Sequence, residues 1–158
     1  MIGFDLVSLN FTKTQFTSFT IKNNNQIEIN INYNNKCIPT ITYTKFLSLT
    51  VDCWLTWINH IDLLTKKKKL SATCNSIWNI KPYLFISTLK IIYHSQFHSI
   101  MSYAIMFWGN SSHSSVIFKI QKRIIIKYSY RESCRELFKE LKILTLITVY
   151  ILFITVHC

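Results

Sequence analysis

The spacing of hydrophobic residues changes once along this chain, about a third of the way in, and this change limits the folds open to it. Before the change, residues 26–33 alternate polar and apolar side chains, which predicts a half-buried strand whose apolar face is Ile27, Ile29, Ile31 and Tyr33. Residues 15–21 predict a preceding strand, joined to it by a turn at Asn23–Asn25. After another turn at residues 34–36, the segment 42–51 predicts a further strand.

From Trp54 onward, apolar residues recur every three or four positions, which is the spacing of amphipathic helices. The first stripe consists of Trp54, Trp57, Ile58, Ile61 and Leu64. It resumes after Lys66–Lys69 and runs to Lys81, because Pro82 disfavours a helical conformation in the residue before it.

Three more helices are expected. Ser87 is a candidate N-cap for a long helix over residues 88–108, which would end in the turn residues 109–112. Residues 116–128 and 131–141 predict two shorter helices. Strands followed by helices indicate an α+β fold, with a small antiparallel β region over about residues 14–51 and a mostly helical region after it.

Composition narrows the class of protein. The 158 residues are 49% apolar, so the chain has ample surface to bury and is not intrinsically disordered. Its 18 basic and 7 acidic residues give a net charge of +11, which favours polyanionic partners such as nucleic acid or acidic lipid. The five cysteines include no CxxC pair, which argues against a zinc ribbon. With no signal-peptide pattern, we expect an intracellular protein of the nucleus or cytoplasm.

Basic residues are the strongest candidates for a functional surface. Lys66–Lys69 is most simply a solvated face, as charge runs usually are. On a helix over 116–128, three cations would lie opposite an apolar stripe: Lys119, Lys122 and Arg123 against Ile117, Ile120, Ile124 and Tyr128. Such cations would contact phosphates, giving a salt-dependent affinity without sequence preference.

Two other features have simpler explanations. His94 and His98 share a helix face at the spacing of two zinc ligands, but no further ligand accompanies them, so we interpret them as a structural or surface pair. The apolar segment 143–158 would span about 24 Å as a helix, short of the roughly 30 Å of a bilayer core. We therefore favour a buried helix or strand remnant over a membrane anchor there.

Several stretches, in order, match one known pattern. Leu6–Thr14 is similar to LSLNxxKT, and Lys45–Ile61 is similar to KFLGxxxDxxLxWxxHI. Ser95–Ser112 is similar to the end of YxxFHSIMxYGxxFWGNSS. Ile117–Arg123 and Arg131–Lys139 are similar to IFxxQKRxIR and RxSCRxLFKxLxIL. Together they resemble the C-terminal part of a non-LTR retrotransposon reverse transcriptase of the jockey-like kind, over nearly the whole chain.

This resemblance implies a division of the chain and an activity. Residues 1–52 would be the last palm strands of the polymerase, residues 53–142 a thumb-like helical region, and residues 143–158 an apolar C-terminal remnant. The intact family copies RNA into DNA with Mg²⁺ ions held by an Asp-Asp pair upstream of these segments. This chain has only Asp5, Asp52 and Asp62. We therefore expect a truncated reverse transcriptase that is inactive alone, with no metal or cofactor of its own.

The resemblance also implies roles for particular residues. Lys13 would be an accessory residue near the phosphates of the incoming nucleotide. An RNA or DNA template–primer would be contacted by Phe46, Leu47 and Ser48 at the primer grip, and by Lys119, Lys122 and Arg123 along its backbone.

The chain departs from the family pattern at several places. Ser48 and Ala104 each stand where the family has Gly, and Thr145 stands where it has Pro. Ile124–Lys127 lacks the family's second Arg, and the run Lys66–Lys69 is longer than the family's pair.

Two alternatives follow from composition alone. One is a non-enzymatic basic module that binds RNA or DNA. The other is a small membrane-associated protein anchored by residues 143–158, although we do not expect a membrane partner.

Overall fold

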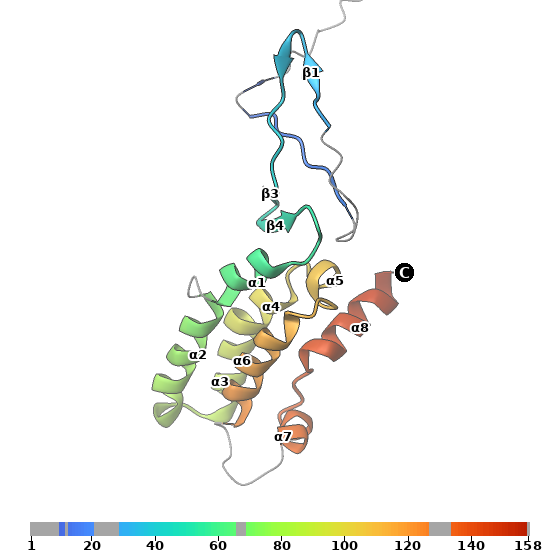
Figure 1. Ribbon diagram of the computed structural model, residues 1–158. Coiled ribbons are helices and arrows are strands. Elements are labelled where there is room, and N and C mark those ends of the chain that lie inside the picture. Colours follow the sequence, from blue (N-terminus) through green and yellow to red (C-terminus); the bar gives the residue numbers. More distant parts are fainter. Residues whose placement is uncertain (1–9, 12, 21–28, 66–68, 127–133, 158) are drawn as a thin grey trace, which may run out of the picture. The chain divides into compact units, whose positions relative to one another are not determined.

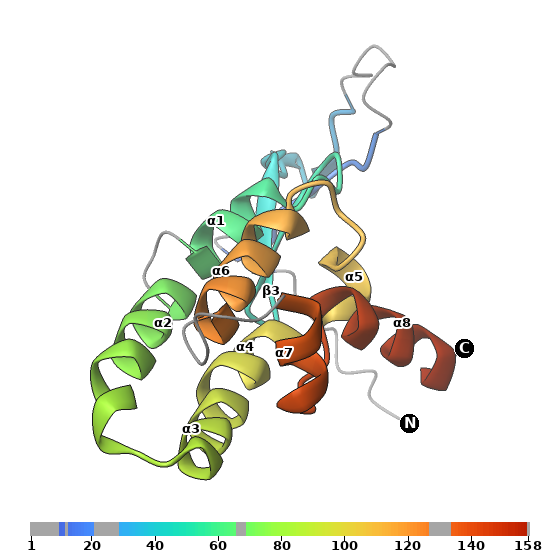
Figure 2. The same cartoon turned by 90° about the horizontal axis from the view of Figure 1, so that it is seen from below.

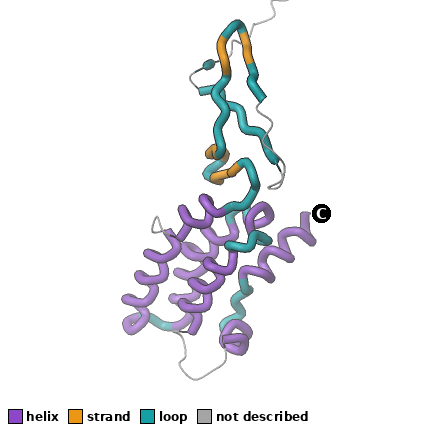
Figure 3. Tube along the Cα trace, viewed as in Figure 1, coloured by secondary structure: helices purple, strands orange, loops and turns teal. Residues whose placement is uncertain are grey.

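The computed structural model describes residues 10–11, 13–20, 29–65, 69–126 and 134–157 (Figure 1). The chain forms two compact units, Met1–Leu55 and Thr56–Cys158. The described strands all lie in the first unit and the described helices all lie in the second (Figure 3). Two antiparallel two-stranded sheets precede the helices, which confirms the predicted α+β fold.

The first sheet of the N-terminal unit is a short hairpin. Strand β1 (Asn32–Tyr33) pairs with β2 (Lys36–Cys37) around Asn34 and Asn35, whose φ angles are 50° and 58°. Asparagine tolerates this left-handed conformation better than most residues do, which confirms the turn predicted here. The predicted turn at Asn23–Asn25 and residues 26–28 lie outside the described residues. The strand predicted over residues 26–33 is confirmed only at Asn32–Tyr33, and the strand predicted over residues 15–21 is not formed by residues 15–20, of which only Phe16 makes an isolated bridge, to Thr40.

The second sheet corrects one expectation. Residues 42–51 are not one strand but a hairpin of β3 (Tyr43–Phe46) and β4 (Leu49–Asp52). The reversal falls on Leu47 and Ser48, whose φ angles are 45° and 67°. Neither residue is among the Gly, Asn and Asp that favour a left-handed turn, and this conformation costs roughly 1–2 kcal/mol per residue, so the sequence carried no clear signal for this reversal.

The first helix of the C-terminal unit begins later than predicted. Helix α1 covers Ile58–Thr65, whereas the apolar stripe starts at Trp54. Trp57 has a φ of 63°, which is incompatible with a right-handed helix and delays its start. The stripe itself is confirmed within this unit for three of its members, since Trp57, Ile61 and Leu64 are buried.

The next helices follow the prediction except at one boundary. Helix α2 (Lys69–Ile80) ends at the 3₁₀ turn η1 (Lys81–Tyr83), which contains Pro82, as expected. Helix α3 begins at Ile86, so Ser87 lies inside its first turn and the predicted N-cap is wrong. The N-cap is Phe85, which makes no capping hydrogen bond through its side chain.

The long helix expected over 88–108 is interrupted. It consists of α3 (Ile86–Ile92), the π-helical turn η2 (Tyr93–His98), α4 (Ser99–Ser102) and α5 (Ile105–Trp108). The break lies at Tyr103, with ψ 117°, and Ala104, with φ 51°. The break leaves the Tyr103 carbonyl outside the helical hydrogen-bond pattern. The indole N–H of Trp108 donates to this carbonyl at 3.1 Å and so provides its partner.

The remaining helices complete the core of the unit. They are α6 (Ser114–Ile126), α7 (Cys134–Glu140) and α8 (Leu146–His157). Helix α6 lies against α1, α2, α7 and α8, so it is central to the unit (Figure 2). The fully buried side chains of the unit include Tyr93, Phe97, Met101, Trp108, Ile117 and Ile124.

Candidate nucleic-acid interface

The two faces of α6 have opposite character. Ile117, Ile120 and Ile124 are buried, which confirms the apolar stripe predicted for this helix, while Tyr128 lies outside the described residues. Lys119 and Arg123 are exposed one turn apart. The packing of α6 therefore directs two cations to the surface and leaves them available to a polyanion.

Lys122, the third predicted cation, has a different environment. It is half-buried, and its Nζ lies 4.6 Å from the centre of the Phe118 ring, which is a cation–π distance. Phe118 in turn stacks with Phe138 of α7, with ring centres 6.4 Å apart and planes inclined by 27°. The structure thus separates Lys122 from Lys119 and Arg123 and directs it toward α7.

A buried amide holds α6 in place. Gln121 is fully buried, and its Nε2 donates to the Tyr93 hydroxyl and to the Leu144 carbonyl, both at 2.8 Å. Its Oε1 accepts the Leu146 N–H at 2.9 Å. One side chain therefore links α6 to the π-helical turn and to the start of α8, with both ends of its amide satisfied.

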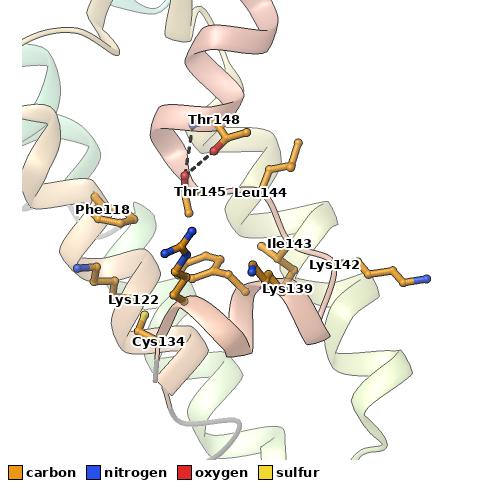
Figure 4. A pocket seen from close by; sticks show the side chains of 11 residues that line it. Phe118, Lys122, Cys134, Lys139, Lys142, Ile143, Leu144, Thr145 and Thr148 are labelled. Carbon is orange, nitrogen blue, oxygen red and sulfur yellow. Dashed lines mark hydrogen bonds between the residues drawn. The ribbon is translucent and has the colours of Figure 1, made fainter. Parts of the chain in front are cut away.

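A pocket of about 690 Å³ opens between α6, α7 and the start of α8 (Figure 4). Its apolar lining includes Phe118, Phe138 and Ile143. Its cations are Lys122, Arg135, Lys139 and Lys142, and the described residues that line it include no carboxylate. Figure 4 shows the side chain of Lys142 extending away from the pocket, so the remaining cations of the lining are Lys122, Arg135 and Lys139. Such a site suits an anion that also carries apolar surface.

The first turn of α8 forms one wall of this pocket. Thr145 is the N-cap of the helix, because its carbonyl accepts the Val149 N–H at 2.9 Å and its Oγ1 accepts the Thr148 N–H at 3.3 Å. The two threonine hydroxyls lie 2.8 Å apart, as the dashed lines in Figure 4 show. This cap fixes where α8 begins and so fixes the wall.

The candidate residues of the N-terminal unit are surface residues. Lys13 is exposed and follows a turn in which its N–H donates to the Asn10 carbonyl at 3.0 Å. Phe46 and Leu47 are 64% and 70% exposed at the tip of the β3–β4 hairpin, beside the exposed Ser48. Two large apolar side chains exposed on one turn form a small hydrophobic surface.

The histidine pair lies on the π-helical turn η2. The rings of His94 and His98 are 5.2 Å apart between centres. Burial lowers the pKa of His98 below its usual value of 6.5, and the adjacent His94 lowers it further. In the described part of the chain no group of three or more His, Cys, Asp or Glu side chains is placed to hold a metal ion.

Two other predictions concern the lysine run and the apolar C-terminal segment. Lys66–Lys68 of the run lie outside the described residues. Helix α8 buries Leu146 and Val149 and exposes Ile147 and Ile151. No helix in the described ranges is long and apolar enough to cross a membrane.

Sequence reasoning missed the residues that build the pocket. Arg135 and Lys139 lie four residues apart in the sequence, but their spacing does not place them beside Lys122. The only available signal was the alternation of aromatic and basic residues around Phe118 and Phe138.

No protein-family model, curated protein or solved structure matches this chain.

Proposed function

We propose that this chain corresponds to the end of the palm and the thumb-like region of a non-LTR retrotransposon reverse transcriptase. We further propose that its helical unit binds the sugar–phosphate backbone of an RNA or DNA template–primer. The palm-like segment would contribute the exposed hairpin tip at Phe46–Ser48, and the thumb-like helices would contribute the cations of α6.

The backbone conformation at two positions carries the proposal. Ser48 and Ala104 stand where the family pattern has Gly, and their φ angles are 67° and 51°. Only eight non-glycine residues in the described ranges have a positive φ. Glycine adopts this conformation at no steric cost, so a pattern with Gly at these positions suits this backbone. The two positions belong to different motifs and different units, so they support the alignment independently.

Two further positions bear on the same alignment. Thr145, which stands where the family has Pro, is the N-cap of α8, so it lies one residue before the first helical position, where proline is favoured. Gly109 is a glycine that the chain shares with the family pattern, and a Cβ added there would lie 2.6 Å from Cδ2 of Tyr150. Gly109 is therefore required by close packing, whereas Ser48 and Ala104 are tolerated at a cost in strain.

The electrostatics of α6 support backbone binding. Lys119 and Arg123 are exposed while the opposite face of the helix is packed, so the helix presents charge from a rigid scaffold. Contacts of this kind bind phosphates without reading bases, which is what a polymerase thumb needs.

The test is a salt titration of binding to a labelled 20-base-pair duplex. Replacing Lys119 and Arg123 with Ala should reduce the slope of log Kd against log salt by roughly two, at about 0.9 per phosphate contact. The matched control is Lys81→Ala with Lys90→Ala, which removes two cations elsewhere in the helical unit and should leave the slope nearly unchanged. An unchanged slope in the Lys119/Arg123 variant would mean that this face of α6 is an ordinary solvated face.

A further inference from the structure

The pocket between α6, α7 and the start of α8 offers more than phosphate contacts. Its cations come from two helices, Lys122 from α6 and Arg135 and Lys139 from α7. Between them lie two phenyl rings that stack on each other, Phe118 and Phe138. Phe138 is buried in the core, whereas Phe118 is only half-buried and lines the pocket with the rest of its ring. A site for backbone alone requires only the cations, so this aromatic surface is unexplained by the function proposed above.

We propose that this pocket holds an unpaired base of single-stranded nucleic acid, stacked on Phe118, with the flanking phosphates on Lys122, Arg135 and Lys139. This inference rests on the proposed nucleic-acid function and adds a preference for single strands to it. Proteins that bind single strands without sequence preference combine stacking aromatic rings with a cationic groove, and this pocket has both.

Charge complementarity selects this occupant. The described residues that line the pocket are basic, polar or apolar, with no carboxylate among them, so the ligand is an anion. The cations are distributed over two helices rather than gathered at one point, which suits the repeated charges of a strand better than the single headgroup of a lipid. A volume of about 690 Å³ lies within the roughly 300–1,000 Å³ of small-molecule pockets and leaves room for a base.

The geometry explains why Lys122 differs from its neighbours on α6. Its ammonium group lies over Phe118, at 4.6 Å from the ring centre, whereas Lys119 and Arg123 are exposed and do not line the pocket. Lys122 is thus positioned to neutralise a phosphate next to a base that occupies the pocket. Lys119 and Arg123 serve duplex and single strand alike.

The experiment compares a labelled 15-nucleotide oligo(dT) with a labelled 15-base-pair duplex, using fluorescence anisotropy on the full chain. Phe118→Leu keeps an apolar side chain but removes the aromatic face. We expect it to raise the Kd for oligo(dT) on the order of ten-fold, the loss of one stacked base, and to change the Kd for duplex by less than about two-fold. Unchanged affinity for oligo(dT) would overturn the pocket proposal, and the duplex result would still report on the backbone proposal.

Two charge variants keep the proposal testable if Phe118→Leu does not fold. Arg135→Ala with Lys139→Ala should weaken oligo(dT) binding more than duplex binding, whereas Lys119→Ala with Arg123→Ala, which removes the same charge, should weaken both equally. The proposal would be overturned if the ratio of the Kd for oligo(dT) to the Kd for duplex changed equally in the two variants. A second control uses vesicles of phosphatidylserine and phosphatidylcholine. The proposal would also be overturned if these vesicles bound the wild type but not the Arg135/Lys139 variant, while oligo(dT) bound both proteins. A wild type that binds neither oligonucleotide would overturn the proposed function and this inference together.

Discussion

The two units of this chain bury very different amounts of side chain. Among the described residues of Met1–Leu55, only Leu49, Thr50, Asp52 and Cys53 are buried. All other buried residues among those described lie in the helical unit, including Trp108 and Tyr93, which have no exposed surface. The difference follows from secondary structure, because a helix satisfies its own backbone whereas a two-stranded sheet leaves both edges unpaired. Isolated hairpins are marginal in water, so the helical unit is the part expected to fold by itself.

This contrast bears on the proposed interface. The cations of α6 and the pocket belong to a packed scaffold, so they are held in place before any ligand arrives. Phe46 and Leu47 belong to a hairpin with little core behind them. We expect nucleic-acid binding by the helical unit to survive conditions that unfold the hairpins.

The largest effect is expected from a substitution in the core of the helical unit. Trp108→Ala removes a side chain with no exposed surface and its hydrogen bond to the Tyr103 carbonyl. It should lower the free energy of unfolding by about 3–5 kcal/mol. The matched change in the other unit is Phe46→Ala. Because this side chain is 64% exposed, the substitution should change the free energy of unfolding by less than about 0.5 kcal/mol. Urea unfolding followed by circular dichroism at 222 nm measures both, and equal effects would refute the contrast.

A smaller effect tests the polar link inside the same unit. Gln121→Leu leaves the buried Leu146 N–H without its acceptor and should lower the free energy of unfolding by about 1–3 kcal/mol. The control is Gln96→Leu, an exposed glutamine on η2. The same urea titration applies. A neutral Gln121→Leu would mean that packing alone holds α6 against α8.

Restoring glycine at the two strained positions should have different consequences in the two units. Ala104→Gly relieves a left-handed residue in the packed helical unit and should raise the free energy of unfolding by roughly 0.5–1 kcal/mol. Ser48→Gly relieves the same kind of strain in the β3–β4 hairpin. It should raise the amide protection of residues 43–52 in hydrogen exchange without moving the midpoint of the helical unit. A shift of that midpoint would show that the units unfold together.

The smallest effect concerns pH. The pKa of His98 is lower in the folded chain than in the unfolded chain, chiefly because the ring is partly buried. The unfolded chain therefore binds more protons below about pH 6.5, and stability should fall as the pH decreases through this value. His98→Gln should reduce this loss. His94→Gln should raise the pKa of His98, measured by NMR titration of its ring protons, and an unmoved pKa would exclude repulsion between the two rings.

Local pattern was sufficient for much of the helical unit. The stripe of Ile117, Ile120 and Ile124, the end of α2 at Pro82 and the turn after Trp108 were all predicted correctly, because each depends on residues within a few positions of one another. The order of strands before helices was enough to predict the α+β class.

The features that were not predicted depend on residues distant in sequence or on strained backbone. The break at Tyr103–Ala104 and the reversal at Leu47–Ser48 use residues with no turn preference, so only the surrounding packing reveals them. Sequence by itself determined which residues of α6 face the core and which carry charge. The tertiary structure decided that Gln121 joins three elements and that Lys122 lies with Arg135 and Lys139 around two phenyl rings, because contacts between helices depend on how their faces meet and not on spacing within any one of them.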